Sequence, residues 1–221
     1  MSKLESINIP IYWKNKSGIH IIDVTNYMKD KIQKLMDLTN KSEYIGETED
    51  TIGWTHKKYI VEKVERIENE NLWKKYSIQR DLMSSRPEQK CYEIIPNIET
   101  NSNNWEMDLS HLDSKINESY LFHGTSQFVS EIIKFQGFDE RVANLQGYFG
   151  GGIYFGQNCS KSDEYCGKKD QINCMMFLSR VLIGDPFISL QVKKGYFSFL
   201  LLFFFSLFLF LILFEFYKNK K

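Results

Sequence analysis

Two glycine-containing segments carry residues whose types and spacing could form a ligand site. The first ends in His123 and Gly124, and the second spans residues 152–156. Glycine has no side chain, so a ligand can approach the main chain closely. Tyr154, Tyr165 and the nearby Ser162 would add two ring faces and a hydroxyl group. Such a set suits a flat ligand that carries an amide, although a glycine-rich turn beside buried tyrosines has the same composition.

The first half of the chain predicts two helices and a strand that would support this site. Residues 1–21 show no clear periodicity and are interpreted as an edge segment or a remnant of something longer. Thr25 is a good N-cap for a helix that should end near Asn40. Residues 59–67 are rich in β-branched side chains and predict a strand, after which Asn69 caps a short helix. The inward positions of the two helices are predicted to be Met28, Ile32, Leu35 and Met36 in the first, and Leu72, Trp73 and Tyr76 in the second.

The second half predicts the elements that hold the candidate residues. Residues 119–124 predict a strand that ends in glycine. Residues 126–137 predict a helix with Gly137 at its C-cap. Its inward residues are predicted to be Phe128, Val129, Ile132 and Ile133. Residues 160–166 would form one or two helical turns, and residues 173–184, apolar on both faces, predict a central strand covered on both sides.

Composition and charge narrow the classes of function. The formal net charge is zero, so no global field attracts nucleic acid. The four cysteines follow no secretory signal peptide, so we expect reduced thiols in a cytoplasmic or nuclear protein. Cys166 and Cys174 lie eight residues apart with no histidine between them, and a zinc site needs about four ligands, so no metal is expected.

Four segments in a fixed order resemble the catalytic domain of poly(ADP-ribose) polymerases, tankyrase-like members above all. These segments read VERIENENLWKKY, YLFHGT, GFDERVANLQGYFGGGIYFGQNCSKSDEYC and MMFLSRVLIGDPF, and the likeness covers roughly residues 59–190. The resemblance implies an α+β ADP-ribosyltransferase fold, with mainly antiparallel sheets around an NAD cleft and helices on the flanks. It also implies transfer of ADP-ribose from NAD, the co-substrate, to protein acceptors with release of nicotinamide, and it leaves mono- and poly-ADP-ribosylation both open.

The same resemblance implies a role for each candidate residue. His123 would donate a hydrogen bond to the adenosine ribose. Gly124 would hold the nicotinamide carboxamide through its main chain, and Ser162 would bind the same group. Tyr165 would stack on the nicotinamide ring, and Tyr154 would cover the opposite ring face. His123 and Tyr154 would be the histidine and the tyrosine of a catalytic His-Tyr-Glu triad.

Three further residues are matched to the adenosine or pyrophosphate region: Thr125, Asp139 and Arg141. Arg141 could equally form a surface ion pair with Asp139 or Glu140. Cleavage of the bond between nicotinamide and ribose passes through a cation-like transition state, so the site would need a carboxylate near the ribose.

The family glutamate that supplies this carboxylate has no expected counterpart here. It would open a strand beyond residue 187, whereas Glu140, Glu164 and Glu215 stand in other contexts. An alternative function follows, namely a catalytically inactive NAD-binding or interaction module, which could be tethered to a membrane.

The last residues change abruptly in composition. Residues 197–214 form a run of 18 uncharged residues, with lysine and tyrosine on both sides. By length this run predicts a transmembrane helix outside the transferase core, and a mistranslated intron is the rival interpretation. The expected organisation is an N-terminal segment (1–21), an incomplete transferase domain (22–195) and an apolar tail (196–221).

Overall fold

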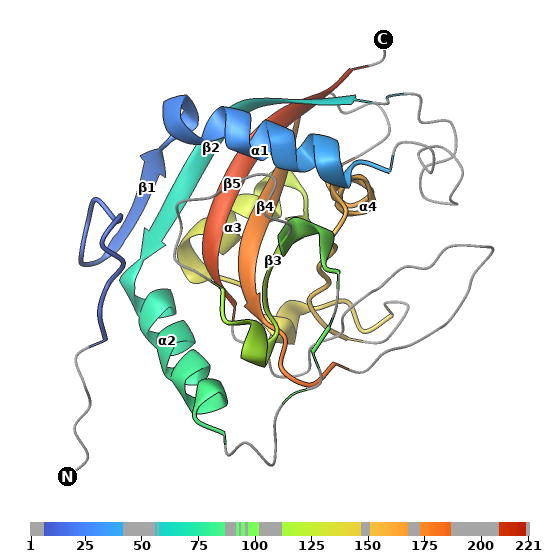
Figure 1. Cartoon of the computed structure of the whole chain (residues 1–221). Helices are drawn as coiled ribbons and strands as arrows, with labels where there is room; N and C mark the ends of the chain where they lie inside the picture. Colours follow the sequence, from blue (N-terminus) through green and yellow to red (C-terminus); the bar gives the residue numbers. More distant parts are fainter. Residues whose placement is uncertain are drawn as a thin grey trace.

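The computed structural model describes residues 7–41, 56, 58–86, 92, 94–95, 97–101, 112–146, 151–167, 173–186 and 208–219. Within these ranges the protein is α+β and holds one antiparallel sheet in the order β1-β2-β5-β4-β3. The strands are β1 (Ile19–Asp23), β2 (Lys58–Asn69), β3 (Glu118–Gly124), β4 (Asn173–Leu182) and β5 (Phe208–Asn219). Helices α1 (Thr25–Thr39) and α3 (Gln127–Gln136) cover opposite faces, with α2 (Glu70–Ser84) and α4 (Cys159–Asp163) at the margins (Figure 1).

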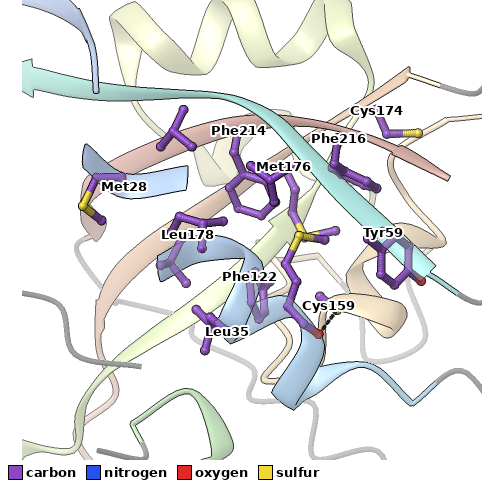
Figure 2. Packing of buried hydrophobic residues seen from close by; sticks show 14 of the residues in the cluster. Met28, Leu35, Tyr59, Phe122, Cys159, Cys174, Met176, Leu178, Phe214 and Phe216 are labelled. Carbon is purple, nitrogen blue, oxygen red and sulfur yellow. Dashed lines mark hydrogen bonds between the residues drawn. The ribbon is translucent and has the colours of Figure 1, made fainter. Parts of the chain in front are cut away.

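The face of the sheet under α1 holds the largest part of the core. The four predicted inward residues of α1 are buried, as expected from their helical spacing, and they pack with side chains of all three central strands (Figure 2). Phe122, Phe214 and Phe216 are fully buried in this cluster. Thr25 is the first residue of the helix rather than its cap, which is Val24, and its hydroxyl accepts a hydrogen bond from Val64 N at 3.0 Å.

Helix α3 packs on the other face through fewer apolar residues than predicted. Ile133 is buried, but Phe128, Val129 and Ile132 are 78%, 38% and 41% exposed, so their predicted inward orientation is wrong. The buried face instead includes Lys134, whose Nζ lies 3.0 Å from a carboxylate oxygen of Glu65 on β2. A paired charge can occupy a buried position that apolar periodicity would assign to a hydrophobic residue.

Helix α2 begins at its predicted cap and runs further than predicted. The side chain of Asn69 accepts a hydrogen bond from Leu72 N at 3.1 Å, and the helix continues to Ser84. Its buried Tyr76 donates a hydrogen bond to Glu118, which also lies 2.6 Å from Nε of Arg180. Burial alone would raise the pKa of Glu118, but the bonds from Arg180 and Tyr76 hold it below its usual value. This buried cluster fixes the start of β3.

The apolar tail is not a helix in the part that the structure describes. Residues 208–219 form strand β5, which inserts between β2 and β4 and pairs with both (Figure 1). The expectation that the run would lie outside the core is therefore wrong for these residues. Residues 197–207, the first part of the run, lie outside the described residues. Among the described residues, no helix has the length and apolar character needed to cross a bilayer.

The apolar run was predicted to be a helix because its sequence pattern does not distinguish a buried strand from a helix. A continuous apolar run fits a strand buried on both faces as well as a buried helix, and periodicity does not separate the two. In β5, Phe214 and Phe216 pack into the cluster under α1, while Leu213 packs with Ile133 of α3 on the other face. The position between two strands also pairs the main-chain groups of β5 on both sides.

Candidate functional site

The site lies at the free edge of the sheet, where β3 ends. On the side away from β4, Phe122 exchanges two main-chain hydrogen bonds with Gly156, at 2.7 and 2.8 Å. Amide groups two residues apart on a strand point to the same side. The N–H and C=O of Gly124 therefore point toward the same edge, away from β4. A carboxamide, which carries one acceptor and two donors, matches such a pair of main-chain groups.

Two glycines make room for Ser162 beside this edge. A Cβ atom on Gly124 would lie 1.8 Å from the main-chain oxygen of Ser162, and one on Gly156 would lie 2.9 Å from its hydroxyl oxygen. The packing of α4 against β3 thus requires glycine at position 124, where the clash would be with main chain. The Ser162 hydroxyl donates to Phe122 O at 3.3 Å, which leaves its lone pairs able to accept from a ligand amide.

The turn that follows α4 presents Tyr165 beside the same edge. The amide of Tyr165 donates to Ser162 O at 3.2 Å, so the tyrosine is held one turn after the serine. The residue is 47% exposed, so part of it is accessible to a ligand. Gly124, Ser162 and Tyr165, predicted to share one ligand group, are brought together.

His123 is held on the α3 face of the sheet by three aromatic rings and one carbonyl group. Its ring centroid lies 4.8 Å from Phe138, 5.4 Å from Phe155 and 6.4 Å from Phe177. Its Nδ1 lies 2.8 Å from the main-chain oxygen of Tyr154. The contact joins His123 to the main chain of Tyr154, the other predicted triad member.

The surroundings of His123 set its protonation state. Burial lowers the pKa of His123 to about 4, and the hydrogen bond to Tyr154 O opposes this shift only in part. A carbonyl oxygen only accepts, so Nδ1 carries the hydrogen of the neutral ring. Nε2 is then an acceptor, so a ribose hydroxyl bound there would donate to it, which is the opposite direction from the hydrogen bond that the family resemblance implies.

A pH titration tests this assignment. We expect the His123 ring protons to titrate with a midpoint near pH 4 in NMR spectra of the folded protein. Because the unfolded chain binds this proton more tightly, His123 contributes stability that is fully present above the ordinary pKa of 6.5 and is lost as the pH falls toward 4. A midpoint near 6.5 would show that the ring is solvated and that the aromatic enclosure is not present in solution.

The three residues matched to the adenosine region occupy two places. Thr125 directly follows Gly124 at the end of β3 and is partly buried. Asp139 and Arg141 form a surface ion pair in a short 3-10 turn, with Arg141 Nη2 2.7 Å from Asp139 Oδ2. Of the two surface partners considered for Arg141, the structure thus selects Asp139. This pairing lowers the pKa of Asp139 to about 2.

The strand register does not place Glu215 in line with His123 across the sheet. His123 is level with Phe177 on β4, and Phe177 is level with Leu213 on β5. Glu215 is level with Met175 instead, one side-chain row further along the strand. Its carboxylate contributes to the raised pKa of Lys63, although the hydrogen bond between Lys63 and Glu65 is the larger cause.

Sequence reasoning missed a buried polar cluster directly behind the site. Asp163, the residue after Ser162, is fully buried and meets His56, Tyr59 and Lys218. Two signals in the sequence could have revealed it. Asp163 lies in a segment whose other residues are predicted to be near the site, and Lys218 follows Phe214 and Phe216 at the same two-residue spacing, on one face of a strand.

A family model and several known proteins match most of this chain. The model of the poly(ADP-ribose) polymerase catalytic domain matches residues 39–196. The chain is 31% identical over 195 residues to protein mono-ADP-ribosyltransferase PARP12 of Mus musculus, which covers 85% of this chain and 22% of that protein. It is 26% identical over 201 residues to protein mono-ADP-ribosyltransferase PARP11 of the same species, covering 82% of this chain and 50% of that protein.

A third relative is a probable poly [ADP-ribose] polymerase of Dictyostelium discoideum, 30% identical over 148 residues, covering 65% of this chain and 37% of that protein. The matches thus span between about a fifth and a half of the length of these relatives. The prediction that the chain resembles tankyrase-like members most is corrected, because the two mammalian relatives are mono-ADP-ribosyltransferases.

Proposed function

Because the chain belongs to the poly(ADP-ribose) polymerase catalytic-domain family, whose members are NAD+ ADP-ribosyltransferases, we propose that it binds NAD at the free edge of β3 and transfers ADP-ribose to protein. The observation that carries this proposal is the edge itself. The main chain of Gly124 faces outward there, between the His123–Tyr154 contact and the turn of Ser162 and Tyr165.

Each group then has a task that its geometry supports. Gly124 and Ser162 hold the nicotinamide carboxamide, and Tyr165 offers an exposed ring for stacking. His123, neutral above about pH 4, accepts from the adenosine ribose. Holding the leaving group and the ribose in one strained pose is the part of catalysis that these groups can supply.

The product is proposed to be a single ADP-ribose unit on a protein acceptor. Support comes from the relatives named mono-ADP-ribosyltransferases, PARP12 and PARP11. The proposed setting is cytoplasmic or nuclear, which agrees with three free, buried cysteines: Cys159, Cys166 and Cys174.

A second function, NAD binding without turnover, is favoured by the state of the carboxylates around the site. Asp139 pairs with Arg141, Glu164 pairs with Lys161 at 2.5 Å, and Asp163 is buried in its own cluster. A carboxylate that is already paired stabilises a developing positive charge less well than a free one. Incubating the full chain with labelled NAD separates the two functions: nicotinamide release with labelled protein supports transfer, and binding without release supports the module.

Replacing the stacking residue tests the ligand site independently of turnover. Tyr165→Ala should weaken nicotinamide binding by about 1 kcal/mol, because one aromatic face is lost. NMR titration of both proteins with nicotinamide measures this, and Tyr27→Ala, at a 53% exposed tyrosine on α1, is the matched control. Equal affinity in Tyr165→Ala and the unaltered chain would remove Tyr165 from the site.

A further inference from the structure

The buried cluster behind α4 joins the candidate site to the C-terminal strand. Asp163 is completely buried, and its two carboxylate oxygens face different partners. Oδ2 lies 2.9 Å from Nε2 of His56 and 3.5 Å from the hydroxyl of Tyr59. Oδ1 lies 3.0 Å from Nζ of Lys218.

Two of the three partners of Asp163, Tyr59 and Lys218, come from the central strands rather than from α4. Tyr59, on β2, is level with Lys218, on β5, in the ladder between those strands. Lys218 lies on the same face as Phe214 and Phe216 and is 6% exposed. The ion pair between Asp163 and Lys218 therefore connects the strand at the middle of the sheet to the turn at its edge.

The turn is held from the opposite side by main-chain packing. Ser162, which precedes Asp163, has its carbonyl against Gly124, and Cys166 N donates to Asp163 O at 3.0 Å. Ser162 and Tyr165 thus lie between a steric contact with β3 and a charged contact with β5. A buried carboxylate that loses its cation is strongly destabilised, so the turn should shift when Lys218 is replaced.

We infer that Asp163 and Lys218 are positioning residues. Their buried ion pair holds the end of α4 and the turn after it, so that Ser162 and Tyr165 are placed to bind the nicotinamide group. The inference rests on the proposed NAD site. If so, the affinity for nicotinamide depends on Lys218 of β5, which is far along the chain from the residues proposed to contact the ligand. A purely structural ion pair would change stability and leave the affinity of the folded protein unchanged.

The test compares nicotinamide affinity in variants of two buried ion clusters. Lys218→Met and Asp163→Asn should each weaken binding on the order of tenfold, because the misplaced turn no longer presents Ser162 and Tyr165 together. Lys218→Arg keeps the charge and should retain affinity within about twofold of the unaltered chain. The control is Glu118→Gln, which breaks the buried cluster at the other end of β3 and should lower the melting temperature without a change in affinity beyond about twofold.

NMR titration with nicotinamide gives the affinities, and circular dichroism gives the melting temperatures. If Lys218→Met does not fold, Lys218→Gln replaces it under the same tenfold criterion, because it keeps a hydrogen-bond donor and removes only the charge. Unchanged affinity in the Lys218 variant, or an equal loss in Glu118→Gln, would overturn the positioning role while leaving the proposed function intact. Absence of nicotinamide binding by the unaltered chain would overturn the proposed function, and this inference with it.

Discussion

Phe214→Asp should leave most of the protein unfolded at room temperature. Phe214 is fully buried between β2 and β4, with its ring 6.3 Å from Phe122 and 5.9 Å from Phe216. Removing a buried phenylalanine costs about 3–5 kcal/mol, and an unpaired buried carboxylate adds several more. A domain of this kind has roughly 5–15 kcal/mol in total, so the loss should approach or exceed its stability. Urea unfolding followed by circular dichroism measures the change.

Phe128→Asp is the matched control, because Phe128 is 78% exposed on α3. The same substitution there should change the free energy of unfolding by no more than about 0.5 kcal/mol. A folded Phe214→Asp protein with an unaltered unfolding midpoint would contradict the placement of β5 in the sheet. That result would return the apolar run to the alternatives of a membrane anchor or a mistranslated segment.

Gly124→Ala should abolish measurable nicotinamide binding, with a loss of affinity on the order of a hundredfold. The new Cβ would lie 1.8 Å from the main-chain oxygen of Ser162, and no side-chain rotation can relieve a clash with main chain. Either β3 or α4 must therefore move, and the edge amides and the Ser162 hydroxyl lose their common geometry. NMR titration with nicotinamide, together with a melting curve, measures both consequences.

Gly151→Ala is the control for this substitution. Its Cβ would lie 2.7 Å from the end of the Leu145 side chain, and Leu145 is 77% exposed and free to rotate. We expect its affinity to remain within about twofold of the unaltered chain. Normal binding by Gly124→Ala would show that the nicotinamide group does not meet the protein where β3 and α4 touch.

Much of the fold could be predicted because local signals and burial agreed. The face of α1, the cap at Asn69, the strand ending in Gly124 and the glycine after α3 all have a specific physical cause within a few residues of chain. The run that became β5 had no such signal, because its apolar residues suit a doubly covered strand and a membrane helix equally. Its place was decided by β2 and β4, which are distant in sequence.

In the site, too, the features with local signals were predictable and those that depend on distant residues were not. Glycines and aromatic residues near His123 and Tyr165 marked the edge of β3, and the family resemblance supplied their expected roles. The pair of Asp163 and Lys218 was not predictable, since a buried charge is recognisable only when its partner is known. The proton on Nδ1 of His123 was equally out of reach, because it depends on a carbonyl group 31 positions further along the chain.

A crystal structure of the full chain grown with nicotinamide would test the proposed site most directly. We predict that the carboxamide lies within hydrogen-bonding distance of the main chain of Gly124 and the hydroxyl of Ser162, with the pyridine ring stacked on Tyr165. Nicotinamide bound elsewhere, or a clear map with this edge of β3 occupied only by solvent at saturating ligand, would contradict it.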